Sequence, residues 1–73
     1  MSEEQHYAKA IEKVLSELPR ILKYGGKDGQ DFLVHSLERL PKGYLVRLIY
    51  KSKDGQEAIN VSIDDNLDVE GWN

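Results

Sequence analysis

Acidic and amide side chains near the end of the sequence have the spacing of a calcium-binding loop. Asp64, Asn66 and Asp68 stand at positions one, three and five of that pattern. An EF-hand also requires a glycine at position six, where this sequence has Val69. The segment is therefore interpreted as a solvated acidic tail, and no metal site is predicted.

A histidine, a serine and several aspartates supply the residue types of a catalytic triad. His35 and Ser62 could serve such chemistry only if folding brought them together, because a triad is defined by geometry and not by composition. Gly25-Gly26-Lys27 has the residue types of a phosphate-binding loop, but that motif precedes a helix, whereas here a helical pattern comes first. We therefore expect no catalytic residue, no cofactor and no enzymatic activity.

The composition is that of a small globular domain. The 73 residues include no cysteine, carry a formal net charge of −3, and are 32% charged and 40% hydrophobic. One domain, residues 1–73, is expected, and because so short a chain buries a limited core, self-association is a natural support for it. The negative charge argues against nucleic-acid binding. A polar N-terminus and the lack of an apolar run of about 18 residues predict a cytoplasmic protein that does not enter a membrane.

Residues 3–24 have the apolar period of a helix. Apolar side chains recur at steps of three and four, so that they form one stripe on the helix, and most charged residues face away. These apolar positions are Tyr7, Ile11, Val14, Leu15, Leu18 and Leu22. Pro19 removes one backbone hydrogen bond within this segment, which predicts a kink or a break there. Gly25-Gly26 is expected to end the helix.

The apolar period changes to that of β-strands after the helix. Strands are expected at about 32–40, 44–52 and 57–63, with Pro41-Lys42-Gly43 as the first hairpin loop and Asp54-Gly55 as the second. The sequence Lys-Asp-Gly-Gln occurs at both 27–30 and 53–56, and both copies are interpreted as loop or turn chemistry. The predicted fold is α+β: one N-terminal helix on a three-stranded antiparallel meander in two layers, followed by an acidic tail at 64–73.

The two loops assign each strand residue to one face of the sheet. In this register Val34 lies opposite Tyr50, Leu48 lies opposite Val61, and one face is apolar and covered by the helix. The predicted core positions are Phe32, Val34, Leu40, Val46, Leu48, Tyr50, Ile59, Val61 and Ile63. The other face retains large aliphatic residues that need a cover, either the C-terminal tail or another protein molecule. The residues of this predicted interface are Leu33, His35, Leu37, Leu45, Arg47, Ile49 and Trp72.

The sequence thus favours a non-enzymatic protein-interaction or regulatory module. The open sheet face is the expected contact surface, used either for a homodimer or for a different protein partner. Trp72 is expected to pin the tail to the body or to act as an interface residue. The alternative function is that of an acidic inhibitor or nucleic-acid mimic, in which the carboxylates of the tail would occupy a basic site.

Overall fold

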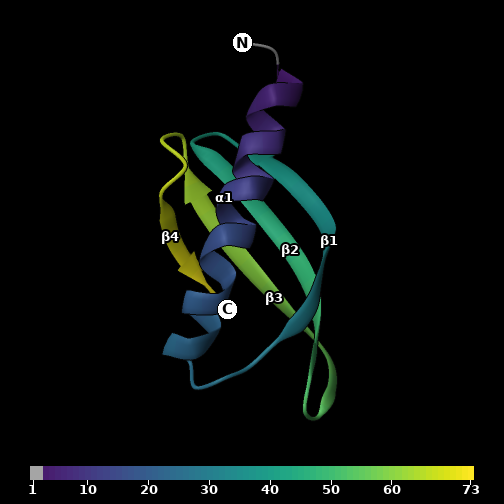
Figure 1. Ribbon diagram of the computed structural model, residues 1–73. Helices are drawn as coiled ribbons and strands as arrows, with labels where there is room; N and C mark the ends of the chain where they lie inside the picture. Colours follow the sequence, from purple (N-terminus) through teal and green to yellow (C-terminus); the bar gives the residue numbers. More distant parts are fainter. Residues whose placement is uncertain (1–2) are drawn as a thin grey trace.

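One helix packs on one face of an antiparallel β-sheet, which confirms the α+β class (Figure 1). The computed structural model describes the backbone of residues 3–73 and the side chains of residues 6–73. The sheet has four strands in the order β1-β2-β3-β4 and not the three that were predicted. The additional strand is formed by the end of the segment that was expected to be an acidic tail.

The helix α1, Glu3–Tyr24, has the predicted bounds and continues through Pro19. The predicted break does not occur, because the residues on both sides of the proline are held in the core. Leu18, Ile21 and Leu22 are buried, while Pro19 itself lies on the exposed side of the helix. Burial of these aliphatic side chains outweighs the loss of one backbone hydrogen bond on the solvent side.

The helix ends at the two glycines as predicted. The Gly26 N–H donates to the Lys23 carbonyl at 3.0 Å, and the Lys27 N–H donates to the Leu22 carbonyl at 2.8 Å. This pair of bonds is the Schellman arrangement that satisfies the last carbonyls of a helix. It turns the chain toward the first strand, and Lys27, Asp28 and Gly29 of the first Lys-Asp-Gly-Gln segment form the connecting loop.

Strands β2, Gly43–Ser52, and β3, Gly55–Asp64, pair two residues out of the predicted register. Leu48 lies opposite Ile59 and not Val61. The turn falls at Lys53-Asp54 because the Ser52 hydroxyl accepts from the Asp54 N–H at 3.2 Å and donates to the Gly55 carbonyl at 3.1 Å. A shift of two residues leaves every side chain on its predicted face.

The second half of strand β1, Gln30–Leu40, pairs with β2 one residue out of the predicted register. Only Pro41 and Lys42 form the loop, and Leu40 lies opposite Gly43. Gly43 must be inside the strand because it also pairs with Asp64 of β3, where its backbone approaches the Ile63 carbonyl more closely than any side chain would permit. The core position predicted for Leu40 is therefore wrong, since its side chain is on the face away from the helix.

A bulge in β1 restores the predicted faces in the first half of the strand. The register changes between Val34 and Ser36, so that Val34 lies opposite Leu48 and Leu33 lies opposite Ile49. Between these pairs β1 advances by two residues while β2 advances by one, which is the geometry of a β-bulge. Val34 consequently faces the core as predicted, although its predicted partner, Tyr50, was wrong.

Strand β4, Val69–Trp72, lies along β3 and completes the sheet. Trp72 lies opposite Val61 and Val69 opposite Ile63, which places both side chains on the helix side. The loop before β4 is organised by the Asp64 carboxylate, which accepts from the backbone N–H groups of Asn66 at 2.8 Å and Asp68 at 3.0 Å. The tail therefore does not cover the opposite face of the sheet.

The core lies between α1 and the helix-facing side of β2 and β3. Its members are aliphatic residues from both layers and two tyrosines from the central strand. The buried set is Ala10, Val14, Leu18, Ile21, Leu22, Tyr44, Val46, Leu48, Tyr50, Ile59, Val61 and Ile63. All the predicted core residues of β2 and β3 are in this set, because the period of two was read correctly there.

Candidate protein-interaction face

The face of the sheet away from the helix contains most of the residues predicted to form an interface. We call this surface the open face and define it by Leu33, His35, Leu45, Arg47 and Ile49. Pairing across β1, β2 and β3 puts Leu33, Leu45, Arg47 and Ile49 on it. His35 lines the same shallow hollow as Arg47 and Ile49, so it also lies on this face.

Two of the predicted interface residues lie elsewhere. Leu37 is opposite Val46 and packs against the core on the helix side, because the short Pro41-Lys42 loop changes the face of this half of β1. Trp72 is also on the helix side, where its ring meets the Tyr24 ring edge-on at a centroid distance of 6.4 Å. With 45% of its surface exposed, Trp72 only partly anchors β4 to the end of α1.

The open face combines apolar surface with a central cation. Leu33 is 64% exposed, and Leu45 and Ile49 are half-buried on either side of the exposed Arg47. Ala58 adds a small exposed apolar residue from β3. Contiguous apolar surface around a polar centre is a common arrangement in protein interfaces.

Arg47 differs from Arg20 and Arg39 in its contacts. Among residues 6–73, whose side chains the structure describes, Arg47 makes no hydrogen bond or ion pair, whereas Arg20 binds Glu17 and Arg39 binds Asp65. The hydrogen bond to Asp65 is the main reason why the pKa of Arg39 is raised above its ordinary value. The Arg47 guanidinium has all its donors available to a ligand outside the chain.

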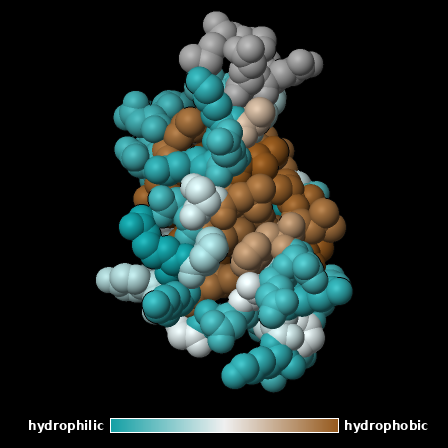
Figure 2. Space-filling view, in the orientation of Figure 1, coloured by the Kyte–Doolittle hydropathy of each residue, from teal (hydrophilic) through white to brown (hydrophobic). Residues whose placement is uncertain are grey.

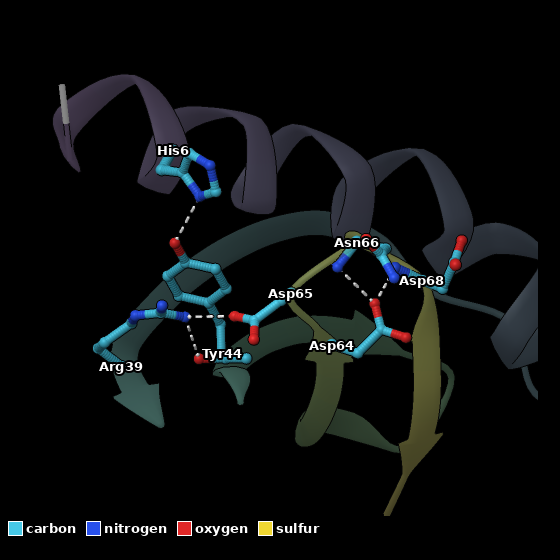
Figure 3. Close-up of polar contacts among 8 residues, drawn as sticks. His6, Arg39, Tyr44, Asp64, Asp65, Asn66 and Asp68 are labelled. Carbon is cyan, nitrogen blue, oxygen red and sulfur yellow. Dashed lines mark hydrogen bonds and ion pairs between the residues drawn. The ribbon is translucent and has the colours of Figure 1, made fainter. Parts of the chain in front are cut away.

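A second polar cluster joins the first turns of α1 to the end of the sheet (Figure 3). The His6 Nδ1 lies 2.8 Å from the Tyr44 hydroxyl, and the Arg39 guanidinium lies 4.6 Å from the centre of the Tyr44 ring. No local pattern in the sequence indicates this contact, because the two residues are 38 positions apart. Tyr44 is 2% exposed, so its hydroxyl holds the first turn of the helix against the sheet.

In the described part of the chain, Ser62 and Asp64 already have hydrogen-bond partners of their own. The Ser62 hydroxyl donates to the Gly71 carbonyl at 3.4 Å, and the Asp64 carboxylate is used by its own loop. Among the residues that the structure describes, no group of three or more His, Asp or Glu side chains could hold a metal ion. Over the same part of the chain, no helix has the length and apolarity needed to cross a membrane.

Comparison with known protein families, with characterised proteins and with solved structures finds no significant match for this chain.

Proposed function

We propose that this protein is a non-enzymatic interaction module that binds a partner protein through the open face. The observation that supports the proposal is the course of the C-terminal segment. That segment was the one part of the chain expected to cover the open face, and it pairs with β3 with Val69 and Trp72 toward the helix. The aliphatic residues of the open face are then left for another molecule.

The chemistry of the open face favours a partner segment that carries a carboxylate between apolar side chains. Arg47 has no acceptor in the described chain and is flanked along β2 by Leu45 and Ile49. A guanidinium can bind a carboxylate through two parallel hydrogen bonds, and the surrounding aliphatic side chains would exclude water from that pair. His35 and Ser36 beside it supply further hydrogen-bonding groups.

The alternative of an acidic inhibitor or nucleic-acid mimic has weaker support. Such a protein needs carboxylates that are free to meet a basic surface. The Asp64 side chain accepts two backbone hydrogen bonds within its loop, and the Asp65 side chain pairs with Arg39. Of the acidic residues in the segment 64–70, only Asp68 and Glu70 have side chains without such a partner in the described chain.

Affinity capture with matched surface variants tests the proposal. Immobilised wild type is compared with Arg47→Ala, with Leu45→Glu/Ile49→Lys and with Asp68→Asn/Glu70→Gln, and the proteins retained from native lysate are quantified. We expect one or more proteins to be retained by the wild type and by the Asp68/Glu70 variant and lost with the two open-face variants. For the identified partner, Arg47→Ala should weaken binding by about 30-fold, the effect of losing a contact worth about 2 kcal/mol.

Two results would count against the open face as the binding surface. In the first, the same proteins are retained by the wild type and by both open-face variants. In the second, binding is lost in the Asp68/Glu70 variant alone, which would favour the acidic mimic. Circular dichroism of each variant establishes that it is folded before the capture is interpreted.

A further inference from the structure

The outer edge of β1 is a long strand edge with no neighbour. β1 has 11 residues and pairs with β2 alone, so its other edge presents backbone N–H and C=O groups to solvent. β4, at the opposite side of the sheet, has only four residues. A long free edge is a template for pairing with a further strand unless the chain protects it.

Apolar surface accompanies this edge on the helix side. α1 packs over β2 and β3, and Figure 2 shows hydrophobic surface between the helix and the β1 side of the sheet. Leu15 of α1 is 37% exposed, and Val34 and Leu37 of β1 are only partly buried although they pack on the core. A molecule placed along β1 would bury both the strand edge and this apolar band.

The register of β1 shifts at two places, between Gln30 and Leu33 and between Val34 and Ser36, and the second of these, the central bulge, limits the ways in which two β1 strands can pair with each other. Phe32, Val34, Leu37 and Arg39 lie on the helix side, while Leu33, Ser36 and Glu38 lie on the open face. In an antiparallel pair, opposite residues must share a face. This condition is met when Val34 of one copy lies opposite Leu37 of a second copy, because Leu33 then meets Glu38, Phe32 meets Arg39, and the two bulges meet at the centre.

Other registers near the centre of the strand do not satisfy the condition. A shift of one residue sets Val34 against Ser36 or Glu38, which are on the other face. A shift of two residues sets Leu37 against Ser36 in one direction and Val34 against His35 in the other, and each pair joins residues of opposite faces. A bulge normally discourages edge pairing, but here it becomes compatible with pairing when the second strand has the same bulge at the same place.

We propose that two copies of this chain dimerise through antiparallel pairing of their β1 strands. The two sheets become one eight-stranded sheet with a two-fold axis at His35 and Ser36. Val34 and Leu37 of both copies form an aliphatic cluster at the junction, next to Leu15 of each helix. Leu45, Arg47 and Ile49, the residues of the open face on β2, lie away from this junction. Substitutions at these positions therefore test the partner binding proposed above without changing the dimer contact.

Engineered cysteines test the register directly, because the chain has no cysteine of its own. In the proposed dimer the Cα atoms of the two Ser36 residues lie about 6 Å apart, from a strand spacing of about 4.8 Å and a rise of about 3.4 Å per residue, which is within disulfide range. Ser36→Cys is a small change at an exposed position. Ala58→Cys is the control, also exposed and on the same side of the sheet but two strands away from the edge.

We expect the wild type to sediment at twice the 8.4 kDa of the chain and Ser36→Cys to form a covalent dimer under mild oxidation. The high effective concentration of the two thiols should make Ser36→Cys cross-link faster than Ala58→Cys by a factor of about ten or more. Leu45→Glu/Ile49→Lys should remain dimeric. A monomeric wild type at high micromolar concentration, equal cross-linking of the two cysteine variants, or loss of the dimer in the Leu45/Ile49 variant would each overturn the proposal.

Discussion

Replacement of Gly43 by alanine probes the most constrained backbone position of the sheet. Gly43 is buried at the start of β2, has a φ of 155°, and pairs with Leu40 on one side and Asp64 on the other. A Cβ atom at this position would overlap the Ile63 carbonyl oxygen and lie 2.9 Å from the Asp64 Cα. Both obstacles are backbone atoms, so they cannot move aside without separating β2 from β3.

The expected loss of stability has two parts. The positive φ adds about 1 to 3 kcal/mol of backbone strain for a residue with a side chain. Overpacking against the backbone of β3 adds about 1 to 3 kcal/mol. The sum of about 2 to 6 kcal/mol compares with a total unfolding free energy of about 4 to 11 kcal/mol for a chain of this length. Gly43→Ala should therefore leave the protein marginally stable or unfolded.

Gly55→Ala is the matched control. Gly55 also has a positive φ, of 116°, but a Cβ atom there would meet nothing within 4 Å. Gly55→Ala should therefore reduce the unfolding free energy only by the backbone strain, which is about 1 to 3 kcal/mol. Urea unfolding followed by circular dichroism measures the stability of both variants. If the unfolding free energy falls by about 1 kcal/mol per M of urea, the overpacking in Gly43→Ala should place its unfolding midpoint about 1 to 3 M below that of Gly55→Ala. Equal midpoints for the two variants would refute the close-approach argument.

Two further predictions concern the two faces of β2 and the alkaline limit of stability. Leu48→Ala should reduce the unfolding free energy by about 2 to 5 kcal/mol, because Leu48 is fully buried, whereas the half-buried Leu45 should lose clearly less on the same change in urea unfolding; equal losses would mean that the open face is part of the core. Burial, followed by a hydrogen bond to Glu57, raises the pKa of Tyr50 above its ordinary value near 10. The folded state therefore holds this proton more tightly than the unfolded state, so the stabilisation is complete below pH 10 and is lost as the pH rises above it. Tyr50→Phe should show a smaller decline than the wild type in urea midpoints measured above pH 10, and parallel declines would contradict this assignment.

The helix and the faces of β2 and β3 could be predicted because each depends on a local period. The apolar stripe of α1 and the alternation from Tyr44 to Tyr50 give the same result whichever residues form the turns. The register of β2 with β3 was wrong by two residues without consequence for the faces, since two is the period of a strand. Its error came from the Ser52 side chain, whose hydrogen bonds favour a turn one residue earlier than the Asp-Gly pair indicates.

The fourth strand was missed because a bulge hides its alternation. Val69 and Trp72 both face the helix although they are three residues apart, since the register shifts between Ser62 and Ile63 of β3. In a regular strand, residues on the same face are separated by an even number of positions, so the pattern Val-Glu-Gly-Trp does not predict a strand. The acidic residues before it are spaced for the hydrogen bonds of a turn, with Asp64 accepting from two backbone N–H groups, and that spacing only resembles a calcium loop.

The first strand presents a different difficulty, because apolar residues occur on both of its faces. Leu33 and Leu40 face away from the helix and Val34 and Leu37 face toward it, so no register of β1 collects all of them in the core of one chain. Pairing with β2 decides the faces through the close approach of Gly43, which is a tertiary constraint that no local pattern contains. The presence of apolar residues on both faces also makes β1 a candidate for contact with a second molecule. One helix on one side of the sheet cannot bury the apolar residues on both faces of an edge strand. The strand edge and the open face are therefore two surfaces where a further molecule would reduce the exposed apolar area.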